Sequence, residues 1–93
     1  MRTIEWTGQF KRDYRREKKG RHRAGLDRDL FPLIERLAKD ENLDPRHVDH
    51  PLAGEWKDHR DCHIRPDLVL IYRKVADDCI ALVRLGSHSE LGL

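Results

Sequence analysis

The chain has 93 residues, enough for one domain and too few for several independent cores, so residues 1–93 are expected to fold as a single domain. Its net charge is only +2, but residues 1–28 carry ten Lys and Arg against four Asp and Glu, whereas residues 29–93 carry nine against thirteen. Five of the six His lie in the second part. A basic beginning and a His-rich remainder must therefore be explained together.

The sequence excludes several classes of protein. Its longest apolar run is Leu68–Tyr72, far short of the roughly 18 residues that a membrane-spanning helix needs. The opening residues show no apolar segment typical of a signal peptide, so we expect a cytoplasmic protein without membrane contact. Cys62 and Cys79 could form a disulfide, but two buried thiols are the more usual state of a lone cysteine pair in the cytosol.

A short strand and a basic helix are expected first. Thr3–Trp6 carries β-favouring residues, and Thr7 can cap a helix over Gly8–Lys19, in which Phe10 and Tyr14 share one face. The other faces of the helix carry positive side chains: Lys11, Arg12, Arg15, Arg16, Lys18 and Lys19. So much positive charge favours a surface that binds a phosphate backbone over an ordinary solvated face.

A second helix follows a turn over 20–25. Its apolar stripe has helical spacing but contains Pro32, and an interior proline costs about 3 kcal/mol, so we expect either a kink or two helical pieces near Arg28 to Pro32. The stripe consists of Leu26, Leu30, Leu33, Ile34 and Leu37.

The remainder of the chain predicts a long loop and then a sheet. Residues 40–59 lack periodicity and contain prolines, whereas strands are expected from Arg60, over Leu68–Tyr72 and over Cys79–Leu85. The fold class is therefore α+β, with two N-terminal helices packed on a small, mainly antiparallel sheet in the order β-α-α-β-β-β.

The motifs of several chemistries are missing. No tight Cys or His ligand pair is present, and His59 and His63 would not share a face on a strand, so we expect no metal and no cofactor. Cys62 and Cys79 follow the apolar phase of their strands, which indicates buried side chains rather than nucleophiles. The sequence also lacks a Gly-x-Ser-x-Gly motif and a glycine-rich phosphate loop.

Histidine acid–base chemistry is the stronger hypothesis, because imidazole can exchange a proton near neutral pH. His63 is predicted to face away from the core, on the same side as Asp61, while His50 lies in the long loop and His88 follows the last strand. These histidines could be ordinary surface residues, or they could converge on one face of the sheet.

Two further residues could complete such a site. Arg84 offers a fork of donors suited to a phosphate, although a surface ion pair would be equally consistent with its position. Asp67 could be a turn residue after Pro66, or it could orient a neighbouring imidazole. Together with the basic helix, these groups favour a nucleic-acid substrate.

Two segments carry a resemblance to a known family. Residues 50–72, HPLAGEWKDHRDCHIRPDLVLIY, resemble the pattern H-P-L-x-G-x-W-x-x-x-R-D-x-H-x-x-P-D-x-x-L-I-Y of the YafQ branch of the RelE superfamily. Residues 84–91, RLGSHSEL, are similar to its ending R-x-G-[ST]-H-x-x-[LF]. The likeness extends over essentially the whole chain and implies a RelE-like fold.

The resemblance implies a toxin of a type II toxin–antitoxin system. Such toxins are endoribonucleases that enter the ribosomal A site and cut messenger RNA without a metal ion. The implied partners are a cognate antitoxin of the RelB or DinJ type, the ribosome with its mRNA, and operator DNA bound through the antitoxin complex. The alternative is a binding module that keeps the fold but has no catalytic activity.

The resemblance also assigns roles to residues. It implies His88 as the general acid, Arg84 as the contact to the transition state, and His50 or His63 as the base, oriented by Asp67. Lys57 joins the basic residues of the first helix as an expected RNA contact. Where relatives often carry aromatic residues, this chain has Leu68 and Leu91. Leucine cannot stack on a base, so codon preference or rate is expected to differ.

Overall fold

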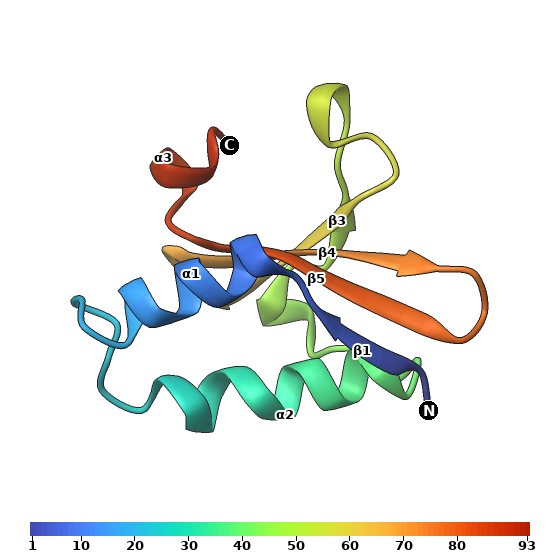
Figure 1. The fold of residues 1–93 in the computed structure, drawn as a ribbon, viewed down its shortest axis with the longest axis horizontal. Coiled ribbons are helices and arrows are strands. Elements are labelled where there is room, and N and C mark those ends of the chain that lie inside the picture. The colour runs from blue at the N-terminus through green and yellow to red at the C-terminus, as the bar shows by residue number, and fades with distance from the viewer.

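The computed structural model describes all residues 1–93 and contains five strands and three α-helices (Figure 1). Short 3-10 helices, η1 and η2, interrupt the loop before the third strand. The elements in chain order are β1 (Thr3–Trp6), α1 (Gly8–Glu17), α2 (Leu26–Ala38), η1 (Pro45–His47), β2 (His50–Pro51), η2 (Gly54–Trp56), β3 (Arg60–Arg65), β4 (Leu68–Val75), β5 (Cys79–Gly86) and α3 (His88–Leu91).

The strands form one sheet in the order β1-β5-β4-β3-β2. β1 is parallel to β5 and all other neighbours are antiparallel, so the predicted α+β fold with a mainly antiparallel sheet is confirmed. The structure adds elements that the sequence did not predict: the 3-10 helices η1 and η2 and the two-residue strand β2 inside the long loop, and the short helix α3 after β5.

α1 begins where the sequence predicts it. The Thr7 hydroxyl accepts a hydrogen bond from the Phe10 amide at 3.2 Å and donates one to the Leu82 carbonyl at 2.7 Å. The helix ends at Glu17, two residues before the predicted end. Because β1 pairs only with residues 79–82 of β5, the outer edge of β5 is open beyond Leu82, and α1 lies along it (Figure 1).

α2 is a single helix of 13 residues that continues through Pro32, so the prediction of two separate pieces is wrong. Pro32 is exposed, which leaves the Arg28 carbonyl, the group that lacks its helical donor, on the solvent side of the helix. The opposite side of α2 carries the predicted stripe, and all five of its residues are buried: Leu26, Leu30, Leu33, Ile34 and Leu37.

The sheet is covered on both faces. The main core of 15 buried residues fills the space between the sheet and the helices α1 and α2. A smaller cluster, Val69, Ile71 and Leu91, lies on the other face, where α3 and the loop around η2 cover the sheet (Figure 1). Cys62 is buried and Cys79 partly buried, and both are free thiols, as expected. None of the helices has the length and apolar character required to cross a membrane.

Leu30 provides a test of the main core, since its side chain is completely buried. Leu30→Ala should lower the free energy of unfolding by about 2–5 kcal/mol. The substitution loses the transfer free energy of the removed atoms, and the cavity that it leaves adds a further cost. Urea denaturation followed by circular dichroism would measure this. Leu93→Ala, at a position that is 41% exposed, is the matched control. Equal losses in the two variants would contradict the proposed core.

Candidate active site

The predicted site residues gather on the face of the sheet that carries the smaller apolar cluster. In β3, Cys62 and Ile64 point into the main core, so Asp61 and His63 point to the opposite face. Asp61 pairs with Ile71, and Ile71 pairs with Arg84, which puts all three side chains on one face. The alternation in the sequence therefore predicted the correct side of the sheet for His63.

His88 and Asp67 form the first pair in this site. His88 begins α3, whose start is fixed by a capping box between Ser87 and Glu90. Its Nδ1 lies 3.2 Å from Asp67 Oδ1, and its backbone amide donates to the same oxygen at 3.4 Å. These hydrogen bonds from His88 lower the pKa of Asp67, and an ion pair with Arg21 contributes further. Asp67 is therefore more than a turn residue.

The partner of Asp67 differs from the one expected. The family resemblance implied that Asp67 orients the base, His50 or His63, whereas its carboxylate contacts His88. The reason is the position of α3, which directly follows β5 and brings its first residue to the turn between β3 and β4. His63 nevertheless joins this group, because its ring lies 5.0 Å from the ring of His88 in an edge-on arrangement.

His50 has a different carboxylate partner, Asp61, which was not among the predicted site residues. Pairing of β2 with β3 places the two residues opposite each other, and His50 Nδ1 lies 2.9 Å from Asp61 Oδ1 and 2.8 Å from the Val48 carbonyl oxygen. Asp61 is only 2% exposed, and burial raises the pKa of its carboxyl. The alternation along β3 placed Asp61 on the same side of the strand as His63, but it did not indicate that the Asp61 side chain is buried.

The buried Oδ1 of Asp61 has no aligned hydrogen-bond donor. His50 is close enough for an ion pair, but its ring is out of line for a hydrogen bond to that oxygen. Such an unpaired buried oxygen is rare and costs stability. Asp61 is thus held in an unfavourable environment beside a histidine of the site.

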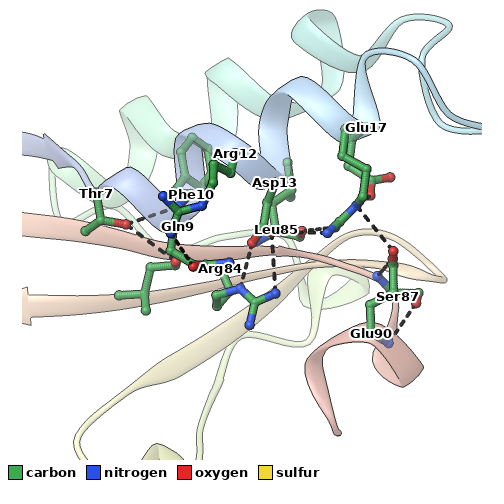
Figure 2. Close-up of polar contacts among 12 residues, drawn as sticks. Thr7, Gln9, Phe10, Arg12, Asp13, Glu17, Arg84, Leu85, Ser87 and Glu90 are labelled. Atoms are coloured by element: carbon green, nitrogen blue, oxygen red, sulfur yellow. Dashed lines mark hydrogen bonds and ion pairs between the residues drawn. The ribbon is translucent and has the colours of Figure 1, made fainter.

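Arg84 makes an ion pair, but with a buried partner rather than at the surface. Its Nε lies 2.7 Å from Oδ2 of Asp13, a residue of α1 that is 2% exposed (Figure 2). The Nη1 group of Arg84 has no hydrogen-bond partner within the protein, so part of the guanidinium fork is available to another group. Both interpretations of Arg84 from the sequence, an ion pair and a phosphate contact, are compatible with this geometry.

The two leucines that replace family aromatics are both buried. Leu68 belongs to the main core and Leu91 packs on Val69 and Ile71. Neither side chain presents a surface on which a base could stack. Trp56, half-buried in η2, instead lies edge-on to His59 with ring centroids 5.4 Å apart.

All seven expected RNA contacts are exposed at the surface, but they are not equally free. Arg16 is engaged with the carboxylates of Asp13, Glu17 and Glu90, and Lys18 pairs with Asp27. The remaining five form no ion pair within the protein: Lys11, Arg12, Arg15, Lys19 and Lys57. No group of three or more His, Cys, Asp or Glu side chains is arranged to hold a metal ion.

Comparison with known proteins identifies the family. The sequence model of a family described as bacterial toxin of type II toxin-antitoxin system, YafQ, matches residues 2–92. The chain is 37% identical over 91 residues to the mRNA interferase toxin YafQ of Escherichia coli, covering 98% of this chain and 96% of that protein.

Solved structures agree with the sequence match. The toxin in the DinJ–YafQ complex of Escherichia coli superimposes with a TM-score of 0.83 at 36% identity, covering 98% of both chains. A metal-bound toxin from Helicobacter pylori superimposes with a TM-score of 0.87 at 41% identity, covering 98% of this chain and 99% of that one.

The environment of Asp61 predicts a pH-dependent stability. The pKa of Asp61 is raised in the folded protein, so ionisation of this carboxyl lowers the free energy of unfolding. This loss of stability is absent below the ordinary pKa, near 3.9, and it develops as the pH rises through the folded-state pKa. Asp61→Asn should therefore be more stable than the parent at pH 7, and this advantage should disappear at about pH 3. Urea denaturation at several pH values would measure it.

Asp67→Asn is the matched control with the opposite sign. The pKa of Asp67 is lowered, so its carboxylate stabilises the fold above the ordinary pKa and loses this contribution as the pH falls. This variant should be less stable than the parent at pH 7. A loss of stability at pH 7 in Asp61→Asn would show that burial is not the dominant influence on Asp61.

Proposed function

Because the chain belongs to the YafQ family of mRNA interferase toxins from type II toxin–antitoxin systems, we propose that it is a ribosome-dependent endoribonuclease acting in the A site. The convergence of His63, His88 and Asp67 on one sheet face, beside Arg84, is the observation that carries this proposal. A DinJ-like antitoxin neutralises the toxin in the cytoplasm. Their complex binds operator DNA.

The reaction needs no cofactor. The ribose 2′-oxygen loses its proton to a base and attacks the adjacent phosphorus, while the bond to the 5′-oxygen breaks and an acid supplies that oxygen with a proton. His88 is the acid, and its contact with the Asp67 carboxylate orients the ring. Arg84 holds the charge that develops on the phosphate oxygens.

His50 is the base in this mechanism. Its Nδ1 lies 2.8 Å from the Val48 carbonyl oxygen, which can only accept a hydrogen bond, and the Asp61 carboxylate lies nearby as a negative charge. A proton on Nδ1 is therefore favoured, and Nε2 is left with the free lone pair that a base requires. His63, in ring contact with His88, supports the orientation of the acid.

Docking on the ribosome is assigned to the basic surface of α1 and to Lys57. Phosphate groups attract Lys and Arg irrespective of base sequence, which suits a surface that binds ribosomal RNA. The five residues without an internal ion pair carry the main part of this contact. Arg16, which is tied to three carboxylates, contributes less.

A double variant tests the enzyme. The double substitution His88→Ala and Arg84→Ala removes the acid and the transition-state contact. It should lower the rate at which the toxin cleaves mRNA on translating ribosomes by about 100- to 10,000-fold. Growth after induction without antitoxin, and mapping of mRNA 5′ ends, would report it. His59→Ala, which changes a histidine outside the site, should remain toxic.

The alternative, a non-catalytic binding module, gives a different result. It predicts the same growth and the same mRNA 5′ ends for the parent chain and the double variant. That outcome would exclude the enzyme proposal.

A chelator tests the metal-free mechanism. Cleavage by the purified toxin should persist when EDTA is present with enough Mg²⁺ to keep the ribosome assembled, because no step of the proposed mechanism uses another metal. Primer extension on the programmed mRNA would measure the cut. Loss of cleavage that only a transition metal restores would contradict this part of the proposal.

A further inference from the structure

Arg84 is held along one edge of its guanidinium. Asp13 accepts a hydrogen bond from Arg84 Nε at 2.7 Å, and its other oxygen lies 3.4 Å from Arg84 Nη2 (Figure 2). This side-on contact uses the edge formed by Nε and Nη2 and leaves Nη1 without a partner. An arginine bound in this way retains donors for a second anion.

Asp13 is itself fixed by its surroundings. It lies in the middle of α1 with 2% of its surface exposed, and it accepts the Leu85 amide at 2.9 Å and Arg16 Nη1 at 3.1 Å. Leu85 is the residue after Arg84, so one carboxylate binds both the side chain and the adjoining backbone of β5. Apart from Arg84 itself, two donors from two elements therefore fix Asp13: Arg16 on α1 and the Leu85 amide on β5.

We propose that Asp13 is a positioning residue for the RNA-cleavage reaction, holding Arg84 so that its free Nη1 end meets the phosphate under attack. This inference rests on the function proposed above. A free arginine side chain has several rotatable bonds, and their freedom would be lost each time it met the transition state. The contact with Asp13 orders the side chain beforehand, which benefits the chemical step.

Glu17 provides a matched control on the same helix. It is also a buried carboxylate, 5% exposed, and it also binds Arg16, at 2.9 Å. It makes no hydrogen bond to Arg84. Removing its charge tests the effect of losing a buried acid from α1 while the contact between Asp13 and Arg84 stays intact.

Single-turnover cleavage on programmed ribosomes tests the positioning role. Asp13→Asn should lower the cleavage rate at saturating ribosome concentration by about 10- to 100-fold, with the half-saturating concentration unchanged, because docking does not use Arg84. Asp13→Glu keeps the carboxylate and should recover part of the rate, and Glu17→Gln should stay close to the parent. In the Arg84→Ala background, Asp13→Asn should cause no further loss.

Two kinetic outcomes would overturn the proposal. One is an unchanged rate in Asp13→Asn. The other is an equal loss with and without Arg84, which would show that Asp13 acts through general stability. Urea denaturation measures the stability of each variant. The cleavage assays are then run under conditions in which every variant is folded, so that a change in rate does not reflect unfolding.

NMR separates this inference from the proposed function. Exchange of the Arg84 Nε proton with water should be slow in the parent and in Glu17→Gln, and fast in Asp13→Asn. If the parent cleaves no RNA, the proposed function fails, and with it the catalytic role of Asp13, even when exchange is slow. If the parent cleaves RNA but exchange is equally fast in parent and Asp13→Asn, only the positioning role fails.

Discussion

The structure depends on one buried carboxylate at the open edge of β5. β1 is too short to pair with the C-terminal part of that strand, and Asp13 of α1 takes the place of a further strand there by accepting the Leu85 amide, while Arg16 donates to the Leu85 carbonyl at 2.8 Å. A buried charge is tolerated only when it is paired and hydrogen-bonded, and Asp13 has four donors. α1 is therefore attached to the sheet through polar contacts as well as through Phe10.

The same edge ties the third helix into place. Arg16 Nε lies 3.3 Å from Glu90 of α3, and both side chains pass close to Gly86. A Cβ at Gly86 would come within 2.9 Å of the Arg16 guanidinium and 3.2 Å of the Glu90 carboxylate, so these side-chain ends would have to shift. α3 begins two residues after Gly86, and its first residue is His88. The position of the proposed acid therefore depends on contacts that begin in α1, at the opposite end of the chain.

Local patterns predicted the elements, whereas the pairing of side chains needed the tertiary structure. The leucine stripe, the Thr7 cap and the alternation in β3 each depend on neighbours within a few residues, and the helix and strands formed as expected. The partner of each histidine depends instead on strand register and on where α3 starts, so the contact between Asp67 and His88 was not expected. Pro32 shows the same limit, because its effect depended on which side of α2 faces solvent.

The two buried aspartates, Asp13 and Asp61, differ in how completely their carboxylate oxygens are hydrogen-bonded. Asp13 is 71 residues from Arg84 in sequence, and both of its oxygens accept hydrogen bonds, so its charge strengthens the attachment of α1. Asp61 is equally buried, but one of its oxygens lacks a donor and its nearest partner is His50. In the proposed mechanism His50 takes up the proton of the 2′-hydroxyl, and the Asp61 carboxylate lies beside the ring on which that positive charge would form. A fully hydrogen-bonded carboxylate on α1 thus holds Arg84 at the edge of the sheet, and a carboxylate with one unpaired oxygen, on β3, lies beside the proposed base.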